Sequence, residues 1–295
     1  MPGEEQSLND LRRQIDEIDA RIHDLLLQRT EVTQRIGALK GADSVHMRPG
    51  REAAVLRRLI ARHRGDLPKA LIVRIWREIF AAVTALQGSL AVAVYAPEGT
   101  FGYRNLARDH YGWRTPIMAY RSAAQVLEAV SEGGATVGVL PVPRGDEIDP
   151  WWRNLARNGV AVPRVVARLP FAVVEPPRAD SPEALAISLA APEETGRDRA
   201  FLVVETTHVV SRSHLKQILG AADLDVLDVQ VAEEDGGRAL NLIEVEGFVP
   251  EDDPRLERLV SLGEGTVAQV WAVGGFAEPL SLEEMTSPGR GRAGP

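Results

Sequence analysis

The stretch LNDLRRQIDEIDARIHDLLLQRTEVTQRIGALK, residues 8–40, decides the fold of the N-terminal region. Its apolar residues recur at alternating steps of three and four, the spacing of a helix that packs along a continuous seam. The apolar seam consists of Leu8, Leu11, Ile15, Ile18, Ile22, Leu25, Val32, Ile36 and Leu39. Arg29 occupies the one seam position without an apolar residue, and a guanidinium buried there would need an anion. The pattern predicts one long helix, roughly 50 Å in length.

Two cations of this helix are expected to share a face. Lys40 follows Arg29 by eleven residues, which at about 100° per residue returns to within roughly 20° of the same direction, about 16 Å further along the axis. Arg12 lies roughly 100° from Arg29 around the helix, so it cannot reach the same pocket within one chain. It could enter the equivalent pocket of a second copy. A dimeric coiled coil with solvated charges is the simpler alternative for this stretch.

Two shorter helices are predicted next, at about residues 50–63 and 69–87, after a break at residues 41–44. One long helix cannot bury its full seam against two helices of this length, whereas a second copy can complete the core. The sequence therefore predicts an intertwined, all-helical homodimer for residues 1–89.

The composition argues against several classes of protein. The 295 residues are enough for two or three domains, and a net charge of −8 without a run of basic residues argues against nucleic-acid binding. The absence of cysteine rules out disulfides and thiolate sites, and the six histidines lack the spacing of metal ligands, so we expect neither a metal nor a cofactor. An acidic N-terminus and the lack of an eighteen-residue apolar run predict a cytoplasmic protein without a signal peptide or membrane span.

Residues 8–88 resemble the all-helical chorismate mutase family through five short motifs in the order that this family has them. The motifs are LRRQIDEID with Arg12, LLLQR with Arg29, IGALK with Lys40, RPGRE with Arg51 and Glu52, and TALQ with Gln87. The resemblance implies that Arg29, with Arg12 of a second copy, binds the two carboxylates of chorismate. It implies that Lys40 and Gln87 donate hydrogen bonds to the breaking ether oxygen. Glu52 would accept from the ring hydroxyl, and Arg51 would support the site.

The chemistry of this reaction suits these residue types. Chorismate becomes prephenate in an intramolecular pericyclic step, which needs a held conformer and stabilised charge on the ether oxygen rather than a nucleophile. Arginine forks match carboxylates, and a lysine ammonium matches a developing oxyanion. Because glutamine is neutral, we expect a broad pH profile. Two expected substrate-binding positions depart from the family, because Val83 replaces a small hydroxyl residue and Arg48 replaces an aspartate. These departures bear on the expected catalytic efficiency more than on the identity of the enzyme.

Residues 90–195 carry a β-α-β-α-β pattern, which predicts an α/β lobe with parallel strand pairing. The segments VYAPEGTFGYRNLARDHYG and SAAQVLEAVSEGGATVGVLPVP resemble the first part of prephenate dehydratase, which acts on the mutase product. The family's Glu-Asn-Ser is replaced at residues 142–146, its Thr-Arg-Phe signature reads Asp-Arg-Ala-Phe at residues 198–201, and its second lobe is essentially missing. The resemblance therefore implies a degenerate, truncated dehydratase-like lobe. The loop PEGTF, residues 97–101, could still bind a small molecule, or it could equally be an ordinary turn.

Residues 196–282 show the order β-α-β-β-α-β, which predicts a ferredoxin-like fold. At this position the resemblance is to the regulatory ACT domain of enzymes that fuse a mutase to a dehydratase. The motifs that bind phenylalanine in that domain are replaced at residues 212–215 and 244–247, so a structural or dimerising role is an equal alternative. The Gly/Pro-rich residues 283–295 are predicted to be a disordered tail.

The expected fold class is multidomain, with an all-α chorismate mutase dimer, an α/β lobe and an α+β, ACT-like domain. The expected function is that of a chorismate mutase, an isomerase of the shikimate pathway that forms prephenate for phenylalanine and tyrosine biosynthesis. Two alternatives stay open. One is a bifunctional chorismate mutase/prephenate dehydratase, and the other is a non-catalytic regulatory protein that binds an aromatic amino acid or a partner enzyme.

Overall fold

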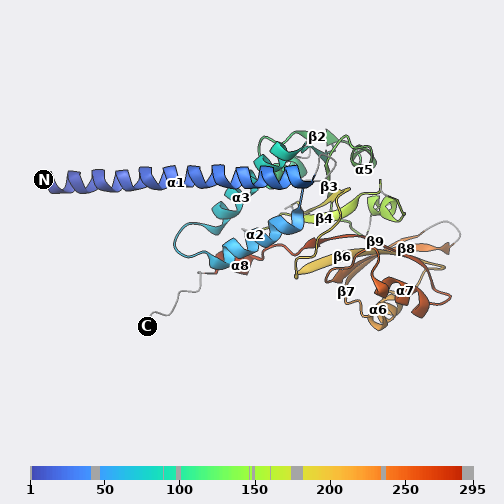
Figure 1. Ribbon diagram of the computed structural model, residues 1–295. Helices are drawn as coiled ribbons and strands as arrows, with labels where there is room; N and C mark the ends of the chain where they lie inside the picture. The colour runs from blue at the N-terminus through green and yellow to red at the C-terminus, as the bar shows by residue number, and fades with distance from the viewer. Residues whose placement is uncertain are drawn as a thin grey trace, which may run out of the picture. The chain divides into compact units, whose positions relative to one another are not determined.

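The computed structural model describes residues 2–40, 47–88, 90–97, 101–145, 147, 150–159, 161–173, 182–233 and 237–287. The chain divides into two compact units. The first unit comprises Met1–His46 and Val83–Ser89, and the second comprises Met47–Ala82 and Leu90–Pro295. Figure 1 labels the helices and strands.

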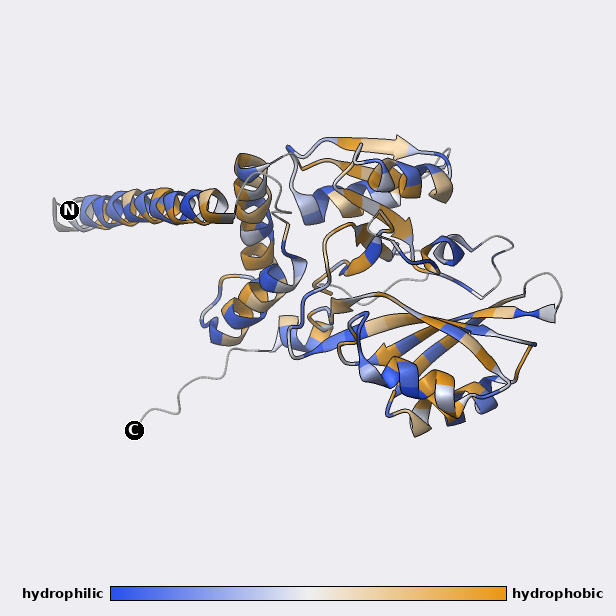
Figure 2. Cartoon of the chain, turned by 45° about the vertical axis from the view of Figure 1, so that its right-hand side comes forward, coloured by the Kyte–Doolittle hydropathy of each residue, from blue (hydrophilic) through white to orange (hydrophobic). Residues whose placement is uncertain are grey.

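Helix α1, Pro2–Lys40, confirms the long helix predicted from the seam. Every apolar residue of the seam is exposed, from 46% at Ile36 to 88% at Leu39. Figure 2 shows hydrophobic residues recurring along this helix. Arg29, Thr33 and Gly37 are half-buried, each about one turn from the next. One face of α1 is therefore covered within the first unit, while the apolar seam stays exposed.

Helices α2, Pro49–Arg62, and α3, Lys69–Gln87, match the predicted ranges within one residue. Leu56 of α2 is fully buried, in an apolar cluster that contains Phe171 and Leu280. This cluster also takes in side chains from the first part of α3. Apolar packing against the sheet region thus explains why α2 and the first part of α3 belong to the second unit.

A short helix follows the last strand. Leu282–Thr286 form α8, which begins with a reciprocal capping box between Ser281 and Glu284. Met285 is buried in the same cluster as Leu56. Residues 283–286 of the predicted tail thus form part of a helix, which a local cap and a buried side chain stabilise despite the polar composition. Residues 288–295 lie outside the described residues.

The α/β half begins with parallel strands. Strands β1 (Val92–Tyr95), β2 (Ile117–Tyr120) and β3 (Val137–Pro141) pair in the order β2-β1-β3, and both pairs are parallel. Helices α4 (Gly102–Tyr111) and α5 (Ala123–Ser131) form the crossovers. The predicted β-α-β-α-β order and its parallel pairing are confirmed.

Two further strands extend this half with antiparallel pairing. Strand β5 (Ala184–Ser188) pairs with β3, and β4 (Arg164–Leu169) pairs with β5. A 3-10 helix, Trp151–Leu155, precedes β4 and buries Trp151 and Trp152 in the core. No periodic pattern in the sequence predicts this helix, because its side chains pack against strands that are distant in the sequence.

The remaining elements confirm the predicted ferredoxin-like order. They are β6 (Asp198–Thr206), α6 (Arg212–Ala221), β7 (Val226–Glu233), β8 (Ala239–Glu246), α7 (Pro254–Leu262) and β9 (Val267–Ala277). The four strands pair antiparallel in the order β9-β6-β8-β7. Helices α6 and α7 cover one face of this sheet (Figure 1), where their apolar side chains form a separate core cluster.

The two halves share one nine-stranded sheet, in the order β2-β1-β3-β5-β4-β9-β6-β8-β7. They meet at β4 and β9 through one paired position, Val165 with Gly274. Gly274 has φ +111°, and a Cβ there would lie 2.3 Å from the Val165 carbonyl oxygen, so this approach requires glycine. The expected boundaries at residues 89/90 and 195/196 do not coincide with the two compact units, and they stay predictions.

Candidate functional site

Gln87 lies against the face of α1 that carries Arg29. Its Nε2 donates a hydrogen bond to the Thr33 carbonyl oxygen at 2.6 Å, and the Thr33 hydroxyl donates to the Arg29 carbonyl oxygen at 2.8 Å. Gly37 makes room for this approach, since a Cβ there would lie 3.2 Å from Gln87 Nε2. Because a primary amide has two N–H groups, Gln87 keeps a second donor beyond its bond to Thr33.

The other predicted residues of the first unit differ in exposure. Arg12 is exposed and makes a long hydrogen bond of 3.4 Å within its own helix. Val83 is 8% exposed and lies one turn before Gln87 on α3. Lys40 is the last residue of α1, and its side chain lies outside the described residues.

Two predicted residues at the start of α2 contact Glu193. Arg48 Nη2 lies 2.6 Å from Glu193 Oε1, and the Arg51 N–H donates to Glu193 Oε2 at 3.1 Å. The Arg51 side chain is exposed. Glu193, which lies between β5 and β6, therefore fixes the start of α2. It also neutralises the positive charge that Arg48 brings.

Glu52 forms an ion pair with a residue that sequence reasoning missed. Its Oε2 accepts a hydrogen bond from Arg77 Nη1 at 2.8 Å, and Arg77 is 4% exposed. The Arg77 guanidinium lies 5.2 Å from the centre of the Phe171 ring. Burial lowers the pKa of Arg77, and Glu52 opposes this shift. One signal was available, because Arg77 follows Val73 by four residues and precedes Phe80 by three, which places it on the apolar face of α3.

Two aromatic residues at the end of α4 adjoin this ion pair. The rings of His110 and Tyr111 lie 4.7 Å apart between centres, and both side chains are buried. Burial lowers the pKa of His110 well below its ordinary value, and the charge of Arg77 lowers it further. Burial raises the pKa of Tyr111, and Glu52 adds to that shift. His110 and Tyr111 are therefore uncharged at neutral pH, beside the charged pair of Glu52 and Arg77.

The structure thus brings Gln87 to the helix face of Arg29 within the first unit, and Glu52 to Arg77 within the second. Across the described ranges, no three acidic or histidine side chains are grouped so that they could hold a metal ion. None of the helices in those ranges is long and apolar enough to cross a membrane.

The position of the dehydratase signature has a structural role in this chain. Asp198 is buried and accepts hydrogen bonds from the Thr195 N–H at 2.8 Å and from the Thr195 hydroxyl at 2.6 Å, which closes the turn before β6. Arg199 forms an ion pair with Glu278 at 2.9 Å. The other replaced motif ends at Asp146, which lies outside the described residues, as do residues 98–100 of PEGTF.

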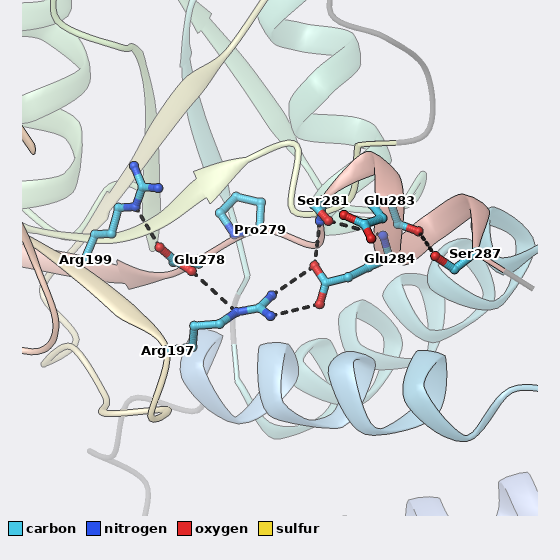
Figure 3. Close-up of a pocket in the computed structure, with 8 residues that line it drawn as sticks. All are labelled: Arg197, Arg199, Glu278, Pro279, Ser281, Glu283, Glu284 and Ser287. Carbon is cyan, nitrogen blue, oxygen red and sulfur yellow. Dashed lines mark hydrogen bonds and ion pairs between the residues drawn. The ribbon is translucent and has the colours of Figure 1, made fainter. Parts of the chain in front are cut away.

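A pocket of about 480 Å³ contains Arg199 (Figure 3). Arg197 binds Glu284 through both Nη atoms, at 2.9 and 3.1 Å, and its Nε lies 3.4 Å from Glu278. Burial alone would raise the pKa of Glu284, but hydrogen bonds from Arg197 and Ser281 lower it. Because glutamates neutralise both arginines, this network holds α8 against the sheet rather than presenting cations to a substrate.

The two stretches that correspond to the ACT motifs also have structural contacts. Residues 212–215 form the first turn of α6, where Ser211 accepts a hydrogen bond from the His214 N–H. Glu244 of β8 forms an ion pair with Arg199 at 3.0 Å. The described contacts of Glu244 are those of an internal ion pair.

Comparisons with known proteins find a similar family for the helical region. Residues 11–88 match the family model described as chorismate mutase type II. The helical region is therefore similar to chorismate mutase type II. A bifunctional chorismate mutase/prephenate dehydratase of Stutzerimonas stutzeri is 33% identical over 151 residues, which cover 49% of this chain and 41% of that protein. A protein of the same description from Neisseria gonorrhoeae is 36% identical over 136 residues, which cover 46% and 37%.

The chain thus spans about two fifths of the length of these curated relatives. Among solved structures, the prephenate dehydratase from Streptococcus mutans is 14% identical with a TM-score of 0.46, covering 64% of this chain and 99% of that chain. A similarity at that distance assigns no activity to the sheet region.

Proposed function

We propose that the chain catalyses the rearrangement of chorismate to prephenate at a site on its N-terminal helices. The match of residues 11–88 to chorismate mutase type II supports the reaction. The observation that carries the proposal is the contact between α3 and α1, which holds the Gln87 amide beside the helix face of Arg29. A neutral donor near a guanidinium suits a dianionic substrate whose ether bond breaks.

The proposed roles in the first unit follow the charges of the substrate. Arg29, with Arg12 of a second copy, binds the two carboxylates and so holds the reactive conformer. Lys40 and Gln87 stabilise the ether oxygen as it gains negative charge. None of these residues has to gain or lose a proton, so activity should change little across neutral pH.

The proposed roles at the start of α2 depend on the contacts found there. Glu52 accepts a hydrogen bond from the ring hydroxyl, with its carboxylate held by Arg77. Arg51 adds positive potential from an exposed side chain. Arg48 adds less, because Glu193 neutralises it. Val83 offers an apolar wall without a hydroxyl donor, so one hydrogen bond to a substrate carboxylate is lost and efficiency falls.

Exposed apolar surface on both long helices supports the proposed homodimer. The seam of α1 is exposed throughout, and α3 adds Leu71, Ile75 and Leu86, which are 40 to 59% exposed. An exposed apolar seam that runs the length of one helix marks an interface more often than free surface. A second copy would bury the seam and could bring its Arg12 to the site.

The test is the loss of chorismate absorbance with the full chain and with Arg29→Ala, Lys40→Ala and Arg12→Ala. Arg13→Ala is the matched control, because Arg13 adjoins Arg12 in sequence but is paired with Asp10 at the surface. We expect turnover by the wild type and the control, and a fall in kcat/KM of at least about 100-fold in each other variant. No turnover by a folded wild-type dimer would overturn the proposal and favour the non-catalytic regulatory alternative.

A bifunctional mutase and dehydratase is the second candidate, because the curated relatives carry that description and the 151 aligned residues exceed the helical region. The contacts of Asp198 and Arg199 argue against it, since both side chains are engaged in internal bonds. We therefore expect chorismate to be consumed and prephenate to accumulate. Phenylpyruvate formed by the purified chain from prephenate would establish the second activity instead.

A further inference from the structure

Arg164 is a buried cation at the edge of a mostly apolar pocket. It is the first residue of β4, is 7% exposed, and lines a pocket of about 620 Å³ in the second unit. The pocket also contains Gly274, at the junction of β4 and β9. Its apolar walls include Val162, Ala190, Phe248, Val249 and Ala272. A pocket of this volume and lining suits a small organic molecule.

The guanidinium of Arg164 has more donors than the protein fills. Its Nε pairs with Glu251, and its Nη2 makes a long hydrogen bond of 3.4 Å to the Arg157 carbonyl oxygen. Nη1 is buried and meets no acceptor in the part of the chain that the structure describes. A buried charged donor without an acceptor is unfavourable, so an acceptor from outside the chain would be stabilising.

Glu251 is a replaceable partner for this arginine. Its side chain is 65% exposed, whereas that of Arg164 is 9% exposed. It lies in the turn between β8 and α7. An exposed glutamate loses side-chain entropy when it is held in one position, and solvent screens its charge. Glu251 can therefore turn into solvent and leave the guanidinium to another carboxylate.

We propose that this pocket binds a small monocarboxylic acid with an apolar body, whose carboxylate replaces Glu251 on Arg164. A guanidinium fork matches a carboxylate, and the apolar walls match a hydrocarbon body. Arg164 is the only cationic side chain among the described residues that line the pocket, so one carboxylate is matched better than a dianion or a phosphate. This proposal does not depend on the mutase activity.

The test uses 3-phenylpropionate and its neutral amide as probes, with binding to the full chain measured by calorimetry. We expect the acid to bind at least ten times more tightly than the amide. Arg164→Met should weaken binding of the acid at least tenfold. Glu251→Gln should tighten it at least threefold, because the internal competitor is removed. Asp252→Asn is the matched control, since Asp252 is the exposed neighbour of Glu251 and does not line the pocket.

Arg164→Met is expected to weaken binding of the acid, whereas Glu251→Gln is expected to tighten it. Because Glu251 is at the surface, Glu251→Gln should fold normally and so tests the proposal even if Arg164→Met folds poorly. Equal affinity for the acid and the amide would overturn the proposal. The same holds if Glu251→Gln binds no more tightly than Asp252→Asn. Binding that disappears in Arg29→Ala would place the probe on the helical region instead, and would also contradict this site.

Discussion

A buried arginine, Arg77, links the proposed site residue Glu52 to the sheet region. Glu52 belongs to the helical motifs, but the side chain that holds it, Arg77, packs on Phe171 after β4. If Glu52 binds chorismate as proposed, Arg77 would be a positioning residue, because Arg77 Nη1 contacts the Glu52 carboxylate. The sequence motifs make Glu52 a candidate but do not indicate its partner, since that contact forms only when α2 and α3 fold against the sheet.

The first prediction concerns Arg77→Met. We expect kcat for chorismate to fall at least about tenfold while KM changes little, because the Glu52 carboxylate loses the donor that fixes it. Arg77→Lys should recover part of kcat. Arg74→Met, an exposed arginine three residues earlier on α3, is the control and should behave as wild type. Breaking a buried ion pair also costs about 3–5 kcal/mol of stability, so kinetics are measured below each variant's unfolding temperature. An unchanged kcat in folded Arg77→Met would contradict the positioning role.

The second prediction is a pH dependence from His110. Because burial and Arg77 lower its folded-state pKa below 6.5, the unfolded chain binds a proton that the folded chain excludes as pH falls below about 6.5. Stability should therefore decrease by up to about 1.4 kcal/mol per pH unit below that point. Tyr111 and Arg77, which adjoin His110, keep their charge states in this range.

Urea unfolding at pH 7.5, 6.5 and 5.5 measures this effect, with His110→Gln as the comparison. The variant should show a flatter pH dependence, whatever its absolute stability. If both chains lose stability in parallel between pH 6.5 and 5.5, His110 is not the group responsible.

At the scale of elements, most helices and strands follow from local pattern. The heptad spacing predicts α1, and alternation bounded by turn residues predicts β1, β2 and β3. The short elements are different. The 3-10 helix at Trp151–Leu155 and helix α8 each have about one turn, too few residues for a period to appear, and both depend on side chains buried against distant parts of the chain.

The third prediction concerns the exposed seam of α1. Ile18 is 51% exposed in the single chain, at a position that a second copy should bury. Ile18→Lys should shift the chain from dimer to monomer, because a buried ammonium without a partner is strongly unfavourable. Glu17→Lys adds a lysine at the neighbouring position outside the seam and should leave the dimer intact. Light scattering behind size-exclusion chromatography measures the mass, and a dimer that tolerates Ile18→Lys would contradict the seam as the interface.

At the scale of the whole molecule, the sequence predicts the three parallel strands of the first half and the four strands of the second, but not the junction of the two halves. The α/β pattern and the β-α-β-β-α-β pattern are each local to a stretch of chain, and each is confirmed. The pairing of Val165 with Gly274 joins residues more than one hundred positions apart, and it depends on one glycine with φ +111°. No period or motif in the sequence marks that contact. For the candidate site, the helical motifs supply residues that stay predictions, whereas Arg77 and Glu193, the partners of Glu52 and Arg48, come into contact through packing.

The separation of Arg12 from Arg29 along α1 has a genetic consequence if the proposed homodimer forms. Each active site would then be built from two different copies, so two inactive chains could rescue one another. After Arg12→Ala and Arg29→Ala chains are unfolded together and refolded, half of the dimers should be mixed, and one site in each mixed dimer should be intact. About a quarter of the wild-type activity should return from two preparations that are each inactive. If the mixture stays inactive while mixed dimers are seen by mass spectrometry, both arginines serve the same chain's site.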